Sequence, residues 1–81
     1  MKVKVKFFAA PREAMGRREV QQKLPEGSTV QGLIDVLAEE YPVLRPYMAQ
    51  MNVAVNRTYV HAGMVLRDGD EVACLPPVGG G

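Results

Sequence analysis

Residues 28–42, STVQGLIDVLAEEYP, contain the clearest helical pattern of the chain. Their apolar residues recur three and four positions apart, as on the buried stripe of an α-helix, at Val30, Leu33, Ile34, Leu37, Ala38 and Tyr41. Either Ser28, with Gln31 three residues later, or Thr29 can cap the first turn. Pro42 ends the helix, because the residue before a proline disfavours the α conformation. We therefore predict one main helix of about three turns.

The segment KVKVKFF, residues 2–8, precedes this helix and alternates with a period of two, which predicts a β-strand. One face of the strand carries Val3, Val5 and Phe7, and the other carries Lys4, Lys6 and Phe8. The lysines are typical of a solvated face, and they also discourage edge pairing. Phe8 is the exception, because it is a large apolar residue on the lysine side.

Two short segments connect this strand to the helix. APREAMG, residues 10–16, predicts a short turn or partial helix that begins with a proline and stops at a glycine. REVQQKL, residues 18–24, predicts a second strand with Val20 and Leu24 pointing inward. Gln22 stands between these two residues and leaves the register open.

The second half of the chain contains three predicted strands. An irregular stretch around Pro46 leads to NVAVNRTYV, residues 52–60, which predicts a hairpin with a tight turn at Asn56-Arg57. EVACL, residues 71–75, predicts the final strand. Pro76-Pro77 ends it, because a proline cannot donate to a strand ladder.

This order of elements predicts an α+β fold in which a mixed sheet of about five strands packs on one main helix. A β-grasp, ubiquitin-like fold fits the order. We expect one domain over residues 1–75 and a flexible, extended tail over residues 76–81. If the first and last strands pair at the centre of the sheet, the tail leaves from a rigid strand.

Composition excludes several classes of partner. The net charge of +1 gives no electrostatic reason to expect a nucleic acid or an anionic membrane. No apolar run is long enough to span a bilayer, and the first residues lack the apolar core of a signal peptide. The one cysteine cannot form an internal disulfide and suits a reducing compartment. We therefore expect a cytoplasmic protein.

Candidate metal ligands and nucleophiles are isolated along the chain. His61 has no partner at metal-ligand spacing. The acidic residues around Asp68-Gly69 lack the spacing of a calcium loop and fit a turn instead. Cys74 lies among apolar residues of a strand, which favours a small buried hydrophobe with an unreactive thiol. We expect no metal site and no catalytic side chain in this chain.

Five stretches follow one another from end to end of the chain: VKFFA…RE, STV…L, VAVN, LRDGDEVA and LPPVGGG. Together they resemble the small subunit of molybdopterin synthase, the MoaD type of sulfur carrier. The family tail has two prolines, an apolar residue, a variable residue and Gly-Gly, which fits residues 76–81. Cys74 departs from the pattern, since relatives often carry an aromatic residue there, and Gly79 makes the tail more flexible than usual.

The resemblance implies a chemistry centred on Gly81. A ubiquitin-activating-like enzyme would adenylate the Gly81 carboxylate with ATP, and a sulfur donor protein would then displace AMP to leave a thiocarboxylate. The carrier would take this sulfur to the large, catalytic subunit of the synthase, where a pyranopterin precursor receives it during molybdenum or tungsten cofactor synthesis. No cofactor is expected on the carrier itself, and its partners would supply the catalytic side chains.

The residue types of the tail suit insertion into enzyme active sites. Pro76 and Pro77 restrict the backbone and so limit the entropy lost on insertion. Val78 follows them, and Gly79, Gly80 and Gly81 allow close approach where a Cβ would clash. We predict that residues 76–80 insert and that Gly81 reacts.

The outer face of the sheet is the expected docking surface. Strand parity turns Phe8, Tyr59 and Leu75 outward, which predicts an apolar partner-binding patch near the tail. A shift of one residue in register would invert this assignment. Lys4, Lys6 and Arg57 either steer an acidic partner or form ordinary solvated surface.

Four functions stay open at this point. The leading one is the small subunit of molybdopterin synthase. A sulfur carrier for tRNA thiolation or thiamine synthesis would use the same thiocarboxylate with another recipient. A ubiquitin-like modifier would be joined through Gly81 to lysines of other proteins. The last is a binding module whose tail has no role.

Overall fold

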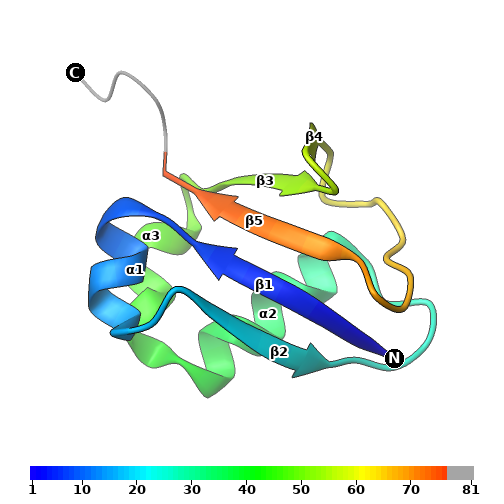
Figure 1. Cartoon of the computed structure of the whole chain (residues 1–81), viewed down its shortest axis with the longest axis horizontal. Helices are drawn as coiled ribbons and strands as arrows, with labels where there is room; N and C mark the ends of the chain where they lie inside the picture. The colour runs from blue at the N-terminus through cyan, green and yellow to red at the C-terminus, as the bar shows by residue number, and fades with distance from the viewer. Residues whose placement is uncertain (77–81) are drawn as a thin grey trace.

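The first and last strands pair in parallel at the centre of a five-stranded sheet (Figure 1). The computed structural model describes residues 1–76. Its strands follow the order β2-β1-β5-β3-β4, and only β1 and β5 run parallel. Their bounds are β1 Lys2–Phe7, β2 Glu19–Lys23, β3 Asn52–Val55, β4 Thr58–Tyr59 and β5 Glu71–Leu75. The predicted mixed sheet is confirmed.

The main helix covers one face of this sheet, and the other face carries no helix within residues 1–76 (Figure 1). The helical elements are α1 Ala9–Met15, α2 Val30–Glu40, the 3₁₀ turn η1 Pro42–Leu44 and α3 Arg45–Met48. Their apolar side chains meet alternate residues of the strands in one core. It comprises Val3, Val5, Phe7, Val20, Leu24, Val30, Leu33, Leu37, Leu44, Val53, Val55, Leu66, Val72 and Cys74.

The start of α2 settles the choice between two possible caps. Thr29 has an extended backbone, and its Oγ1 accepts a hydrogen bond of 3.1 Å from the backbone N–H of Gly32. The Ser28 hydroxyl instead donates to the carbonyl of Pro25. Thr29 is therefore the cap, because an Ncap oxygen bonds to the orphan N–H groups of the first turn.

Two segments are more helical than predicted. The stretch around Pro46 forms η1 and α3 rather than an irregular loop, because proline is tolerated in the first turn of a helix. Leu44 is fully buried and anchors this segment to the core. Residues 9–15 form a complete short helix, which stops at Gly16 in a left-handed conformation with φ 72°.

Gln22 resolves the open register of the second strand. It is 6% exposed and lies on the same face as Val20 and Leu24, so all three point toward the helices. Its Nε2 donates to the carbonyl of Lys23 at 3.2 Å. This hydrogen bond offsets part of the cost of burying the amide.

The β3–β4 hairpin turns through two left-handed residues, Asn56 with φ 50° and Arg57 with φ 73°. A type I′ turn requires this geometry, and glycine is preferred at its second position. Replacing Arg57 by Gly is therefore expected to raise the free energy of unfolding by about 0.5–1 kcal/mol. Urea denaturation would measure the change. Arg67→Gly is the control and should not stabilise, and a loss of stability in Arg57→Gly would contradict the assigned turn.

The stretch LRDGDEVA secures the start of β5. Asp68 accepts a hydrogen bond from the backbone N–H of Lys2 at 2.8 Å. Asp70 accepts from the backbone N–H of Arg67 and from the Asn56 side chain, and Asn56 in turn accepts from the backbone N–H of Glu71. These contacts tie β5 to the hairpin and to β1, so the end of the described chain leaves from a braced strand.

Candidate functional site

The register of the sheet fixes which side chains share its outer face. Val53 and Val55 of β3 belong to the core, so Ala54 points outward. Tyr59 lies directly opposite Ala54, and Ala54 lies opposite Ala73. These three residues form a row across β4, β3 and β5, in which the tyrosine is followed by two small alanine side chains.

Phe8 and Leu75 lie at one edge of this face. Because β1 and β5 are parallel, their carboxyl ends meet at the same edge, with Phe7 opposite Cys74. Phe8 follows β1 in an extended conformation as the N-cap of α1, so it is one residue beyond the strand in which it was predicted. Leu75 is the last residue of β5, and the half-buried Pro76 follows it.

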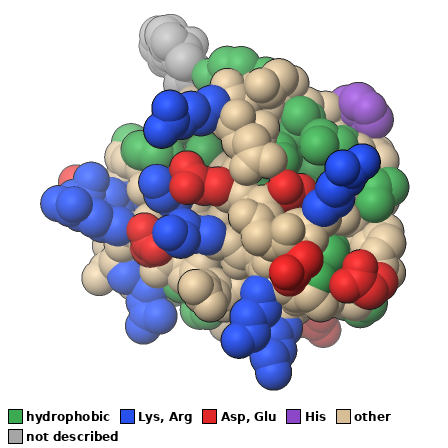
Figure 2. Space-filling view, turned by 45° about the vertical axis from the view of Figure 1, so that its right-hand side comes forward, with side chains coloured by type: hydrophobic (Ala, Val, Ile, Leu, Met, Phe, Trp, Pro, Cys, Tyr) green, Lys and Arg blue, Asp and Glu red, His purple; other side chains and the backbone are tan. Residues whose placement is uncertain are grey.

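The predicted apolar residues therefore lie on the outward side of the sheet. Tyr59 is 65% exposed and Phe8 is 40% exposed, whereas Leu75 is half-buried. Figure 2 views the molecule turned from Figure 1, with apolar side chains toward the upper part of the visible surface. We call Phe8, Ala54, Tyr59, Ala73 and Leu75 the outer patch. Their role in binding stays a prediction.

Two alanines belong to the outer patch although the predicted patch did not include them: Ala73 and the more deeply buried Ala54. Ala54 is only 5% exposed, although no helix lies over it within the described residues. Neighbouring side chains therefore cover most of its surface. The signal was present in the alternation of β3, where Ala54 stands between two inward-facing valines.

Two lysines of the outer face, Lys4 and Lys6, are paired with carboxylates. Lys6 Nζ lies 3.2 Å from Glu71 Oε1, and Lys4 Nζ lies 3.8 Å from Glu19 Oε2. Both pairs join diagonal neighbours on adjacent strands, a position from which long side chains reach each other. The pairs are solvent-exposed and contribute at most about 1 kcal/mol each to stability. Pairing weakens these two lysines as steering charges for a partner.

The reactive end of the predicted site lies outside the described residues. Pro76 is the last residue that the structure describes, whereas the predicted insertion residues Pro77, Val78, Gly79 and Gly80 and the reactive Gly81 follow it. What the fold supplies is the point of departure, at the central strand β5 beside Phe8.

Cys74 is buried, as predicted, and its thiol is unsuited to nucleophilic chemistry. The side chain is 1% exposed and belongs to the core between the sheet and the helices. Burial raises the pKa of the Cys74 thiol from 9.0 to about 12. Because the thiolate is the reactive form of cysteine, this sulfur is an unreactive part of the core.

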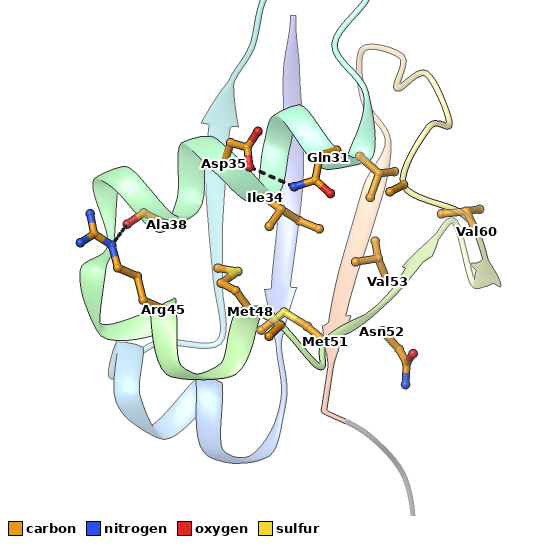
Figure 3. A pocket seen from close by; sticks show the side chains of 13 residues that line it. Gln31, Ile34, Asp35, Ala38, Arg45, Met48, Met51, Asn52, Val53 and Val60 are labelled. Carbon is orange, nitrogen blue, oxygen red and sulfur yellow. Dashed lines mark hydrogen bonds between the residues drawn. The ribbon is translucent and has the colours of Figure 1, made fainter.

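A groove of about 610 Å³ lies on the helix side of the sheet, between α2, α3 and β3 (Figure 3). Ile34, Met48, Met51 and Val53 are among its apolar lining residues. Three of its polar side chains are engaged with one another or with backbone: Gln31 Nε2 donates to Asp35 Oδ1 at 2.9 Å, and Arg45 Nε donates to the carbonyl of Ala38 at 2.9 Å. This groove offers no evident reaction chemistry.

His61 is engaged within its own turn. His61 Nδ1 accepts a hydrogen bond of 3.1 Å from the backbone N–H of Gly63. Within residues 1–76, no group of three His, Cys, Asp or Glu side chains could hold a metal ion. In the same part of the chain, no helix is long and apolar enough to cross a membrane.

Comparison with known proteins gives matches along the whole chain. The model of the ThiS family matches residues 5–81. The molybdopterin synthase sulfur carrier subunit of Mycobacterium tuberculosis is 42% identical, and the alignment covers 100% of this chain and 99% of that protein.

Two solved structures are similar in fold. Small archaeal modifier protein 1 from Haloferax volcanii has a TM-score of 0.87 and 30% identity, with 100% of both chains covered. A protein–protein complex of subunits 1 and 2 of the molybdopterin-converting factor from Helicobacter pylori contains a chain with a TM-score of 0.76 and 27% identity, again with 100% of both chains covered. The predicted ubiquitin-like β-grasp fold is confirmed.

Proposed function

The chain belongs to the ThiS family, and we propose that it is the sulfur carrier subunit of a molybdopterin synthase. The observation that carries this proposal is a combination of two features. The relative named as a sulfur carrier subunit aligns along the full chain, including the glycine tail. In addition, the tail departs from the central strand β5, beside the apolar outer patch on which a partner can dock.

The proposed chemistry converts the Gly81 carboxylate into a sulfur donor. A carboxylate oxygen attacks the α-phosphorus of ATP in an activating enzyme, which forms an acyl adenylate and releases pyrophosphate. Sulfur at the sulfide level, delivered by a sulfur donor protein, then attacks the acyl carbon; the bond from that carbon to AMP breaks, AMP leaves, and a thiocarboxylate remains. In the large subunit the sulfur passes to the pyranopterin precursor, and water returns the oxygen that restores the carboxylate.

The structure supports a non-catalytic role for this chain in those steps. The buried Cys74 is a poor nucleophile, and His61 is engaged with its own turn. The fold instead provides a braced strand and an apolar face. General bases, Mg²⁺ and the sulfur source would come from the partner enzymes, and ATP would bind to the activating enzyme.

Docking on the large subunit should depend on the outer patch. We expect Tyr59→Ala and Phe8→Ala each to weaken binding to the large subunit by about tenfold or more, because exposed aromatic residues at the centre of an interface are frequent hot spots. Isothermal titration calorimetry would measure the affinity. Val43→Ala removes a similarly exposed apolar side chain from η1, on the other side of the sheet, and should leave the affinity unchanged. Equal effects from Val43→Ala and Tyr59→Ala would contradict this docking face.

A reconstitution tests the function as a whole. The chain would be incubated with its activating enzyme, ATP and a sulfur source, and then passed to the large subunit and the pyranopterin precursor. We expect dithiolene product in proportion to the loaded carrier, with recovery of the unmodified mass. If the carrier is loaded with sulfur but does not transfer it to the precursor, another sulfur recipient, such as tRNA or the thiamine pathway, would be favoured.

A protein modifier is the second candidate, because the chain covers all of a small archaeal modifier protein at a TM-score of 0.87. Conjugates would be sought in the native host by mass spectrometry. The last Lys or Arg is Arg67, so trypsin would leave residues 68–81 on the target lysine rather than a Gly-Gly remnant. A search for that longer remnant distinguishes conjugation from sulfur transfer.

A further inference from the structure

A hollow of about 250 Å³ lies beside Phe8, on the β2 side of β1. It is bounded by the end of β1, by α1 and by the start of β2. Its lining residues are Lys6, Phe7, Phe8, Arg12, Arg18 and Glu19. Because β1 lies between β5 and β2, the hollow and the end of β5 flank Phe8 on opposite sides. The hollow is therefore continuous with the outer patch.

Of the four charged residues that line this hollow, two are paired with a residue outside it. Lys6 is paired with Glu71 at 3.2 Å, and Glu19 is paired with Lys4 at 3.8 Å. Within residues 1–76, neither Arg12 nor Arg18 lies within 4.0 Å of a carboxylate oxygen. Figure 2 shows Lys and Arg side chains toward the left of the visible face, with Asp and Glu side chains among them.

We propose that the Arg12–Arg18 hollow receives the carboxylate of an Asp or Glu side chain from the protein that docks on the outer patch. Guanidinium groups bind carboxylates through two parallel hydrogen bonds, and here Arg12 comes from α1 and Arg18 from the turn before β2. Phe8 forms one wall of the hollow and is also a member of the outer patch. A protein that covers Phe8 excludes water from the hollow and strengthens the charged contact.

This contact would fix the orientation of the docked partner. An apolar patch alone is non-directional, since hydrophobic stabilisation depends on the area removed from water. A carboxylate held by two guanidinium groups adds a directional contact on one side of Phe8. The end of β5, at Leu75, lies on the other side. The inference deepens the proposed function, because it rests on a partner that docks over the outer patch.

The test measures binding of the full chain to the large subunit by isothermal titration calorimetry at two salt concentrations. We expect Arg12→Gln and Arg18→Gln each to raise the Kd about tenfold. The Kd of the double variant should rise by less than the product of the two single increases, since both guanidinium groups would contact one carboxylate. The affinity of each variant should also depend less on salt. Arg67→Gln is the matched control, because Arg67 is an exposed arginine outside the hollow; its Kd should stay within about twofold.

Each other outcome decides against the inference. If the wild type binds and both variants bind within about twofold of it, the hollow takes no carboxylate, and the proposed function stands. If the wild type does not bind the large subunit, the proposed function fails and the inference fails with it. Inorganic phosphate titrated into the isolated chain and followed by NMR gives a third arm. Saturable binding that both variants abolish would assign the hollow to a phosphate ligand instead.

Discussion

Gly81→Ala is expected to reduce loading of sulfur by about a hundredfold or more, and deletion of Gly81 should abolish it. The added methyl group would lie beside the reacting carbonyl, in an active site shaped for a backbone without a Cβ. Misplacement of a reacting group by about 1 Å can cost a hundredfold in rate. Release of pyrophosphate by the activating enzyme and the intact mass of the carrier would measure the two loading steps separately.

Gly32→Ala is the matched control for this experiment. It adds the same methyl group inside α2, where the nearest atom to the new Cβ is Thr29 Oγ1 at an ordinary 3.6 Å. Loading of this variant should equal that of the wild type, and its stability should rise slightly because alanine favours helices more than glycine does. Wild-type loading kinetics in Gly81→Ala would refute the assignment of Gly81 as the reacting residue.

Alkylation of Cys74 in the folded protein is expected to be about a thousandfold slower than in the unfolded chain. Only the thiolate reacts, and a shift of the pKa from 9.0 to about 12 reduces the thiolate fraction below pH 9 by about three powers of ten. Iodoacetamide labelling between pH 7 and 9, with and without denaturant, would measure this protection. Labelling of the folded protein at the rate of a free thiol would contradict the packing of β5.

The same shift makes stability depend on pH at the alkaline end. The folded state keeps the Cys74 proton up to about pH 12, whereas the unfolded chain releases it near pH 9. The folded state therefore binds more protons in this window, and the free energy of unfolding falls as pH rises above about 9, by at most about 1.4 kcal/mol per pH unit. A comparison of urea midpoints with those of Cys74→Ala isolates this contribution, since the variant lacks the titrating group.

Protection of Cys74 also separates two possible sulfur species. In the folded carrier a thiol reagent should modify the thiocarboxylate at Gly81, while the buried Cys74 thiol should stay unmodified. Loaded and unloaded protein would then differ in labelling under native conditions and at neutral pH. In denaturant both sulfur atoms should react.

The fold could be predicted where local pattern and tertiary packing favour the same structure. The apolar stripe of α2 and the alternation of β1 are long enough to decide between helix and strand. The choice between Ser28 and Thr29 could not be made, because both hydroxyls can cap and the backbone angles decide. The helical turns after Pro42 were missed, because prolines that end one helix can also begin the next.

The prediction of the outer patch depended on the register of strand pairing, which the sequence alone leaves open. Parity placed Tyr59 and Leu75 correctly only because the strands pair as they do. Arg12 and Arg18 could not be grouped beforehand, because α1 and the following turn bring them to one hollow beside the end of β1. Such groupings arise from tertiary contacts and leave no periodic signal in the chain.

The intact mass of the protein purified from its native host without reducing agent tests the central claim most directly. The account predicts a population in which one oxygen is replaced by sulfur, and this population should disappear when Gly81 is deleted. A persulfide on Cys74 would instead add a whole sulfur atom and survive that deletion. A mass that stays unmodified, even with the activating enzyme, ATP and a sulfur source, would contradict sulfur carriage by this chain.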